Sequence, residues 1–264
     1  MDSRGPSWAR NRGLERATGE VVFFCDADDE VRPGFLSAPS EMLERTDAEL
    51  CLFGFDGFLP RRSYDLAGEE AVRRVFLPTV FGYSFEDVRR WNRGEGLWDS
   101  REWATVWRLA FRRDFIERHR LRFDESVRLC EDAMFLSECA FRCRRMCSVD
   151  EPLYVYRSSA AGLLSQGMRS AAQWDYKFAM LAFRRRLDRE AGGGLWPLCE
   201  ASAVFSALEL LRARKGFLRY ASDPFVARAL RAFPLSFHHP LVAAGVVACR
   251  LLAPFARCAR RTRP

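Results

Sequence analysis

The chain has 264 residues, of which 48% are hydrophobic and 29% charged, and this composition excludes a globally disordered protein. The length fits one large domain, or one domain with an appendage, around a substantial core. The net charge of +7 suits a polyanionic partner, whether a nucleotide diphosphate, an anionic membrane surface or nucleic acid, and does not choose among them.

The nine cysteines are odd in number and form no C-x-x-C pair, which favours reduced thiols over a disulfide framework. The residues after Met1 lack the apolar core of a signal peptide. The apolar stretch 241–256 is interrupted by Arg250 and Pro254 and is shorter than the roughly 20 residues of a membrane-spanning helix. We therefore expect a cytoplasmic protein, with or without peripheral attachment to the inner face of the cell membrane.

The first part of the chain alternates between helical and strand-like patterns. Two helices are predicted here, over residues 7–17 and 33–45, and Gly19 is the stop signal of the first. Strands are predicted over 21–25 and 49–58, and both are short, apolar runs of the kind that is buried on both faces of a sheet. This order predicts an α/β fold with a mostly parallel sheet and flanking helices.

The pattern loosens over residues 60–100, which predict a long excursion with some helix around 68–76. Later elements are predicted as a strand over 105–111, helices over 113–120 and 133–145, and a strand over 147–157. The remainder is predicted to be helical over 171–190, 195–214, 224–232 and 241–259. We expect a first domain over residues 1–168 and a helical region with a basic amphipathic tail over 169–264.

An acidic run, Asp26-Ala27-Asp28-Asp29, follows the first predicted strand directly. Three carboxylates this close repel one another unless a cation or a basic group neutralises them. Mg²⁺ and Mn²⁺ prefer oxygen ligands and commonly join carboxylates to a substrate diphosphate. Ligands of open α/β sheets bind beyond the carboxyl ends of the strands. The run therefore indicates a metal and diphosphate site, and the alternative is an acidic turn that caps a helix.

Three stretches in a fixed order carry a resemblance to a known family. They are Ala9-Arg10-Asn11-Arg12-Gly13-Leu14, then Ala17-Thr18-Gly19-Glu20, then the apolar strand with Asp26-Ala27-Asp28-Asp29. Together they resemble family 2 glycosyltransferases of the GT-A (Rossmann-like) fold, which carry A-R-N-x-G, A-x-G-E and D-x-D-D in this order. The resemblance implies Mg²⁺ or Mn²⁺ as cofactor, with Asp26, Asp28 and Asp29 at the metal. It also implies that Arg10, Asn11 and Asp26 lie beside a nucleotide-sugar donor.

A second stretch runs from Val106-Trp107-Arg108-Leu109 through Leu121-Arg122-Phe123 to Glu131-Asp132. It resembles the family's V-W-N-K-L-Y-R-R, L-R-F and E-D elements. The resemblance implies that Asp132 is the base of an inverting transfer and that Glu131 supports it. A sugar hydroxyl is a poor nucleophile, so the transfer calls for a base, and a carboxylate in hydrogen-bond reach can take the proton. The alternative is an acidic pair that stabilises a helix N-terminus.

The third match is the run of residues 149–157, which resembles the family's V-D-E-P-L-Y-x-Y-R. It places Arg157 near the donor diphosphate, since a guanidinium offers a planar fork to anions, and the alternative is a surface ion pair. The resemblance spans about residues 8–165. Family members begin with an apolar V-S-V-I-x-P-x-Y-N strand that this chain does not show. We therefore expect a partial GT-A domain that lacks its N-terminal nucleotide-binding strands.

The predicted function is transfer of a single sugar to a glycan or lipid-linked acceptor in cell-surface polysaccharide synthesis. The Q-x-x-R-W motif of processive synthases is absent. Residues 241–264 predict peripheral membrane contact, because an apolar side and several arginines suit an anionic bilayer. No nucleic-acid partner is expected, because the arginines are scattered and no recognised module appears. The alternative function is a catalytically inactive fragment that binds a membrane or a partner protein.

Overall fold

The computed structural model describes residues 5–56, 58–60, 62–81, 105–127, 129–157, 176–213, 216–232 and 244–252. The chain divides into two compact units, one of residues 1–80 with 102–168, the other of residues 81–101 with 169–264. The division into independent domains at residues 168 and 169 stays a prediction, and the compact units group 81–101 with the later part of the chain.

The first unit combines a sheet with helices on both faces. Its strands are β1 (Val21–Phe23), β2 (Glu30–Val31), β3 (Leu50–Phe55), β4 (Asp65–Ala67), β5 (Leu109–Arg112) and β6 (Arg145–Val155). Its helices are α1 (Pro6–Arg16), α2 (Ser37–Thr46), α3 (Glu69–Val75), α6 (Arg113–Arg118) and α7 (Glu131–Arg142), with a 3-10 turn, η1 (Val106–Arg108). Helix α4 (Leu77–Phe81) falls at the boundary between the units. These bounds confirm the predicted helices and strands of this region to within a few residues.

The order of the strands is β1-β5-β3-β6-β2, and β4 also pairs with β6. Among the described strands only β3 and β6 run parallel, and the other pairings are antiparallel. The α/β class is confirmed, but the expected mostly parallel sheet is wrong. A short apolar run has the same composition whichever way its strand runs, so the sequence does not show that β5 inserts antiparallel between β1 and β3.

The direction of the strands positions one edge of the sheet for function. Strand β5 is antiparallel to both β1 and β3, and β6 is parallel to β3, so β1, β3 and β6 share one direction. Their carboxyl ends therefore open at the same edge. The acidic run follows β1 there, and Arg157 follows β6. This is the edge at which open α/β sheets bind ligands.

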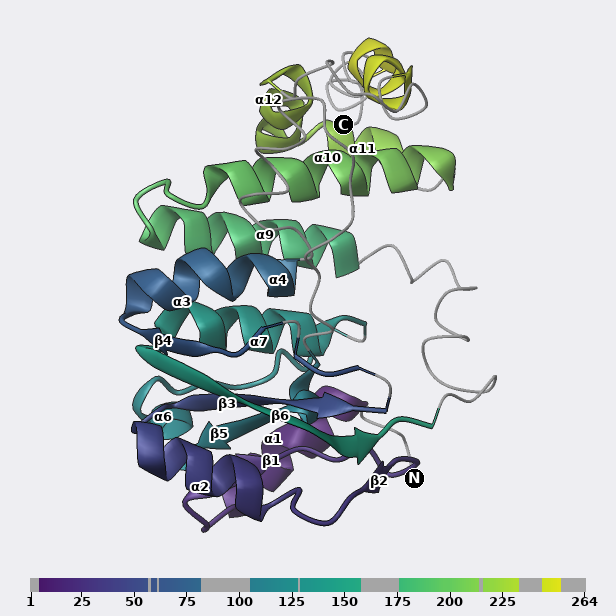
Figure 1. Cartoon of the computed structure of the whole chain (residues 1–264). Coiled ribbons are helices and arrows are strands. Elements are labelled where there is room, and N and C mark those ends of the chain that lie inside the picture. Colours follow the sequence, from purple (N-terminus) through teal and green to yellow (C-terminus); the bar gives the residue numbers. More distant parts are fainter. Residues whose placement is uncertain are drawn as a thin grey trace. The chain divides into compact units, whose positions relative to one another are not determined.

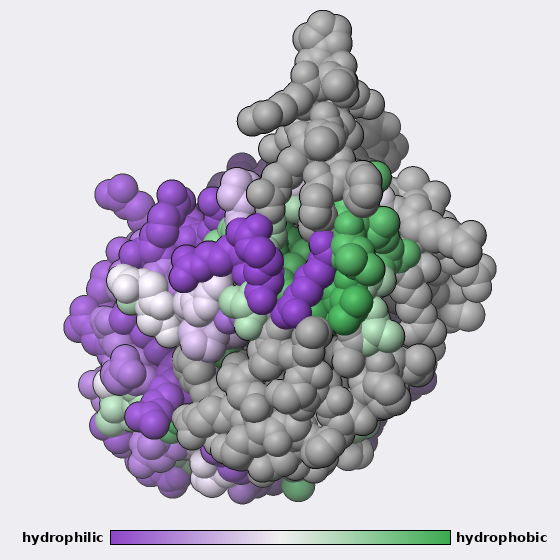
Figure 2. All heavy atoms as spheres, turned by 90° about the horizontal axis from the view of Figure 1, so that it is seen from above, coloured by the Kyte–Doolittle hydropathy of each residue, from purple (hydrophilic) through white to green (hydrophobic). Residues whose placement is uncertain are grey.

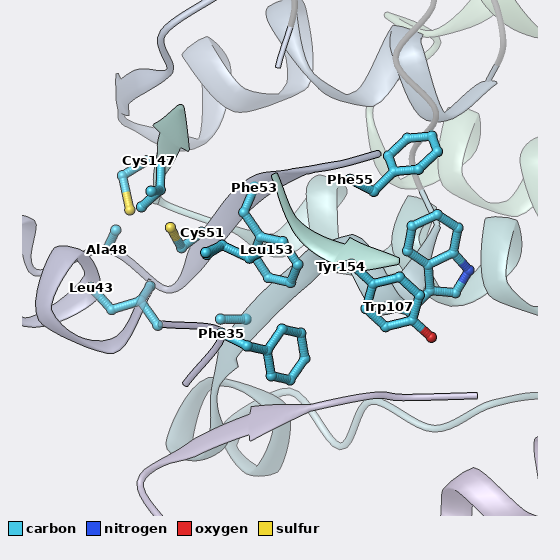
Figure 3. Close-up of a cluster of buried hydrophobic side chains, with 12 residues drawn as sticks. Phe35, Leu43, Ala48, Cys51, Phe53, Phe55, Trp107, Cys147, Leu153 and Tyr154 are labelled. Atoms are coloured by element: carbon cyan, nitrogen blue, oxygen red, sulfur yellow. The ribbon is translucent and has the colours of Figure 1, made fainter. Parts of the chain in front are cut away.

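Aromatic and small apolar side chains fill the sheet on both faces. Helix α2 lies on one face, where Leu43 packs with Phe53 of β3, and α7 lies on the other (Figure 1). In Figure 3, Trp107 and Tyr154 lie at one end of the α2-side cluster and Cys51 and Cys147 at the other. The α7-side core is made by Phe24, Phe111, Phe123 and Phe135, whose ring centroids lie 4.0–6.0 Å apart. Burial of this many large rings is the main source of stability for the unit.

Strand β6 carries an irregularity at Pro152, where its register with β3 shifts around Gly54. A Cβ atom at Gly54 would lie 2.8 Å from the backbone oxygen of Glu151. Only glycine lets the two backbones approach this closely. The irregularity carries β6 on to Tyr154 and so to the edge where the acidic run lies.

The second unit is helical in its described part. It contains α9 (Tyr176–Glu190), α10 (Trp196–Arg212), α11 (Phe217–Ala221), α12 (Pro224–Ala232) and a helix over 244–252. Helix α10 packs against α9, α11 and α12. Gly192 and Gly193 follow the end of α9 with positive φ angles of 62° and 86°, a backbone conformation that glycine adopts without strain. Helix α11 was not predicted, because five residues are too few to show a period.

Candidate active site

The side chain of Arg10 joins two acidic groups that are far apart in the sequence. One terminal nitrogen donates to Asp26 Oδ1 at 2.9 Å, and the other donates to Glu131 Oε1 at 2.8 Å. Burial by itself lowers the pKa of Arg10, but Asp26 and Glu131 outweigh it and the net pKa is raised. Arg10 is therefore a permanent cation that draws the end of β1 and the start of α7 together.

Asn11, the next residue on α1, fixes this helix against the segment before α7. Its Oδ1 accepts from the Phe123 backbone N–H, and its Nδ2 donates to the Phe123 carbonyl, both at 2.9 Å. The same Nδ2 also donates to Glu125 Oε1 at 2.9 Å. Asn11 is 5% exposed and its amide is occupied by these bonds. In this structure it positions Arg10, its neighbour on the helix.

The acidic pair Glu131-Asp132 forms the first turn of α7, so that the alternative reading as a helix N-terminus also holds. Cys130 precedes the helix in a left-handed conformation, with φ of 59°. Burial raises the pKa of Asp132, and the charge of Asp26 raises it further, whereas Arg10 lowers it. Burial and the neighbouring Asp132 likewise raise the pKa of Glu131. A carboxylate with a raised pKa is a stronger proton acceptor, which suits a general base.

The acidic run after β1 is held in place by Tyr154 of β6. The Asp26 backbone N–H donates to the Tyr154 hydroxyl at 3.0 Å, and that hydroxyl donates to Asp29 Oδ2 at 2.7 Å. The Asp29 N–H donates to the Asp26 carbonyl at 3.1 Å, which closes a turn. Burial and the nearby Asp29 raise the pKa of Tyr154, so the hydroxyl stays protonated and keeps donating.

Asp29 and Arg157 contact each other through the backbone. The Arg157 N–H donates to Asp29 Oδ1 at 2.8 Å, so that both oxygens of Asp29 are engaged. The Arg157 guanidinium pairs with Glu30 at 2.6 Å and its side chain is 61% exposed. Arg157 therefore makes the surface ion pair that was the alternative to a diphosphate contact, at the edge that also holds the acidic run.

The carboxylates of the run fit a metal that is shared with a substrate. Asp28 is exposed and Asp26 keeps its second oxygen clear of the Arg10 bond. Within the described ranges, no three His, Cys, Asp or Glu side chains form a metal cluster. Mg²⁺ sites at nucleotides commonly use one or two carboxylates and complete the coordination with phosphate oxygens and water. The donor set of Asp26 and Asp28 fits such a shared site.

A groove of about 620 Å³ lies between α1 and β1 and reaches Arg10 and Asp26. Its walls include Ala9, Gly13 and Leu14 of α1 and the residues of β1. In the described sheet β1 pairs only with β5, so the groove runs along the outer side of β1. The space next to the acidic cluster is therefore large enough for part of a substrate.

Two roles of these residues are not visible in the sequence. Tyr154 belongs to the motif that points to Arg157, but its brace on Asp29 depends on the fold. The aromatic rings of Trp98, Trp103 and Trp107 could stack on a sugar, and packing in the core or a loop is the favoured alternative from the sequence. Trp107 is 5% exposed and stacks on Tyr154 at 4.6 Å and on Tyr156 at 5.6 Å. It is therefore part of the core. The other two candidates for sugar stacking, Trp98 and Trp103, lie outside the described residues.

Comparisons with known proteins show which family the chain resembles. Residues 2–65 match the model of the family "Glycosyl transferase family 2". The chain is 30% identical to the succinoglycan biosynthesis protein ExoO of Rhizobium meliloti, over 90% of this chain and 71% of that protein. It is 31% identical to the uncharacterized glycosyltransferase EpsJ of Bacillus subtilis, over 60% of this chain and 44% of that one.

Among solved structures, the chain resembles TarS 1–349 of S. aureus. The TM-score is 0.58 with the complex of that protein with UDP-GlcNAc, at 14% identity and over 99% of this chain and 73% of that one. A second crystal structure of TarS 1–349 gives a TM-score of 0.56. At this identity the likeness shows the fold, which is a partial GT-A fold as expected.

The fold and the order of the motifs are those of the GT-A class of glycosyltransferases. The chain belongs to family 2 of the glycosyltransferases. It spans 44% of the length of EpsJ and 71% of the length of ExoO.

Proposed function

We propose that this chain carries the acceptor-activating and metal-binding part of a glycosyltransferase that moves a single sugar from a nucleotide sugar to a glycan or lipid-linked acceptor. The observation that carries the proposal is the Arg10 bridge between Asp26 and Glu131. It brings Asp26, a candidate metal ligand, close to Glu131, the neighbour of the candidate base Asp132. The name of ExoO refers to succinoglycan biosynthesis, which supports a role in polysaccharide synthesis.

On the donor side, Asp26 and Asp28 would hold Mg²⁺ or Mn²⁺ together with the diphosphate. The metal, when bound, supplies positive charge that stabilises the departing diphosphate. Arg10 lies beside Asp26 and orients that carboxylate through their 2.9 Å ion pair. Asp29 acts in our proposal as a brace of the run, since both of its oxygens are bonded to Tyr154 and Arg157. The TarS structures with UDP-GlcNAc and UDP support a uridine nucleotide as the probe of choice.

On the acceptor side, Asp132 would take the proton of the acceptor hydroxyl as its oxygen bonds to the anomeric carbon. The bond between that carbon and the diphosphate oxygen breaks, and its electron pair leaves with the nucleoside diphosphate. A direct displacement of this kind inverts the anomeric configuration. Glu131, bonded to Arg10, would hold the start of α7 against the donor site. The raised pKa of Asp132 favours its role as the proton acceptor.

The first test is binding of UDP by calorimetry with and without Mn²⁺. We expect Mn²⁺-dependent binding by the chain, loss of that binding in Asp28→Ala, and retention in Glu44→Ala, which removes an exposed carboxylate from α2. Equal binding by Asp28→Ala and the parent chain would contradict the assignment of the metal site. A transfer assay with the same variants, and with Asp132→Asn, then tests catalysis separately from binding.

A specific observation also supports peripheral membrane contact. Membrane contact without catalysis is what the inactive-fragment alternative predicts. The helix over 244–252 exposes Val247, Leu251 and Leu252 at 40%, 66% and 38%. Figure 2 shows hydrophobic side chains gathered beside strongly hydrophilic ones on this face. The sequence that follows contains Arg257, Arg260, Arg261 and Arg263, which suit an anionic bilayer. No helix in the described part of the chain is long and apolar enough to cross a membrane.

We therefore propose that this helix docks on an anionic lipid surface. Sedimentation with phosphatidylglycerol vesicles should carry the chain down, whereas pure phosphatidylcholine vesicles should not. Leu251→Ser should weaken the binding, and Leu36→Ser, at another exposed leucine, should not. Vesicle binding without any metal-dependent UDP binding would favour the inactive-fragment alternative. Equal vesicle binding by both leucine variants would contradict docking through this helix.

A further inference from the structure

A second pocket lies at the edge of the sheet opposite to the acidic run. It has a volume of about 390 Å³, and we call it the arginine pocket because its lining includes Arg112, Arg118, Arg144 and Arg145. These arginines stand at the end of β5, on α6 and at the start of β6. Strands β3 and β6 begin here, so the pocket lies at the edge opposite to the carboxyl ends of β1, β3 and β6, where the acidic run lies.

Two of the four arginines are engaged by the protein itself. Arg112 donates to the carbonyls of Leu43 and Ala48 at 3.0 and 3.2 Å, and this fixes its guanidinium while leaving its charge in place. Arg118 pairs with Glu49 and Asp114, both at 2.8 Å. Glu49 also accepts from the Arg144 backbone N–H at 2.6 Å, so this carboxylate is already occupied by the protein.

The other two arginines are poorly matched by protein groups. Arg145 reaches Asp65 at 3.4 Å, and its Nε–H is buried without a partner among the described residues. The guanidinium of Arg144 comes no closer to a carboxylate of the described part than 3.9 Å, at Glu69. A buried N–H without an acceptor is costly, so the Arg145 Nε–H favours an added acceptor, and the Arg144 side chain, which is 62% exposed, can reach the same acceptor from solvent.

The two remaining carboxylates of the pocket, Asp47 and Asp114, neutralise the positive charge of its arginines only weakly. Asp47 lies 4.0 Å from Arg112 and its side chain is 98% exposed, so water screens its charge. Asp114 is 68% exposed and paired with Arg118. The charge of Arg144, Arg145 and Arg112 is therefore left to attract an anion. Planar guanidinium groups offer paired donors that match the oxygens of phosphate.

We propose that the arginine pocket binds a small phosphate-bearing anion, with Arg144 and Arg145 as its principal donors. This site is separate from the proposed donor site, since it lies at the opposite edge of the sheet and needs no divalent cation. The assignment does not depend on the proposed transferase activity. Inorganic phosphate and diphosphate are the simplest probes of the class.

The test is calorimetric titration of the full chain with phosphate and with diphosphate in the presence of EDTA, which removes any contribution from a metal site. We expect Arg145→Gln and Arg144→Gln each to weaken binding about tenfold, or about 1.4 kcal/mol. Arg145→Lys keeps the charge and loses the paired donors, so a smaller loss is expected. Arg186→Gln removes an arginine that pairs with Glu190 on α9, and its binding should equal that of the parent chain.

Unfolding curves of each variant show that a loss of binding is not a loss of fold. Equal affinity in the parent chain and in both glutamine variants at positions 144 and 145 would overturn the proposal. An equal loss in Arg186→Gln would also overturn it, because it would show attraction by net charge alone. Phosphate binding in EDTA together with absent Mn²⁺-dependent UDP binding would support this site while contradicting the proposed donor site.

Discussion

The Tyr154 hydroxyl and the Asp29 carboxylate, 125 residues apart in the chain, form a hydrogen bond of 2.7 Å that ties the end of β6 to the acidic run after β1. The same hydroxyl accepts from the Asp26 N–H, so one atom holds both ends of the run. The shape of the candidate metal site thus depends on a residue that contacts neither metal nor sugar in our proposal.

Tyr154→Phe removes both of these hydrogen bonds while keeping the ring that stacks on Trp107. We expect a loss of about 1–3 kcal/mol in the free energy of unfolding, because two partners lose their bond. The Mn²⁺-dependent affinity for UDP should also fall, because the run is no longer held. Urea unfolding and calorimetry measure the two effects. A stable variant with unchanged UDP affinity would show that the brace is unimportant for the site.

Arg10 controls the protonation of the proposed base. Its charge lowers the pKa of Asp132 and of Glu131, while burial raises both. Arg10→Met should therefore raise these pKa values further. Because the base must be deprotonated to work, the acid limb of the rate profile should move to higher pH. An acid limb at the same pH in the variant and the parent would argue against Asp132 as the base that Arg10 tunes.

Asp132 should also limit stability at neutral pH. The pKa of Asp132 is higher in the folded chain than in the unfolded chain. The stability that its protonated form contributes is therefore fully present below the unfolded pKa and is lost as pH rises through the folded pKa. The change in the free energy of unfolding caused by Asp132→Asn should therefore be more favourable at pH 7 than at pH 3. The same variant should abolish transfer. Unfolding at both pH values measures this difference. If Asp132→Asn destabilised the chain at pH 7 but not at pH 3, the direction of the Asp132 pKa shift would be contradicted.

Gly54 and Gly13 make a matched pair for the role of glycine. A Cβ at Gly54 meets two backbone oxygens and Leu59 within 3.0 Å, so Gly54→Ala should destabilise the chain by about 1–3 kcal/mol. At Gly13, on α1, a Cβ meets nothing within 4 Å, so Gly13→Ala should stabilise by about 1 kcal/mol through helix propensity. Thermal unfolding of both variants is the measurement. Equal effects at the two positions would contradict the close approach of β3 and β6.

Asn11→Ala tests the positioning role of α1. It leaves the N–H and the carbonyl of Phe123 without partners, and we expect a loss of about 1–3 kcal/mol for each buried group. Asn11→Asp keeps the acceptor for the N–H but sets a carboxylate against Glu125, and should also be destabilising. Chemical unfolding measures both. Should Asn11→Ala keep full stability and lose only UDP binding, Asn11 would instead contact the nucleotide directly.

The sequence by itself determined the local elements and the identity of the motifs. The sequence predicts a buried strand over residues 21–25 and an acidic site directly after it. Both predictions depend only on residues that are adjacent in the chain. The predicted helices over 7–17 and 133–145 agree with α1 and α7 to within a few residues for the same reason, since the period of a helix spans only a few residues. The order of the motifs was sufficient to indicate the family.

Only the tertiary structure decided which of these local features meet. The Arg10–Glu131 bond spans 121 residues, and the arginine pocket joins the ends of strands that are far apart in the chain. The direction of β5 was likewise not available from its composition. These contacts depend on strand order and direction, and periodicity within a segment carries no information about either.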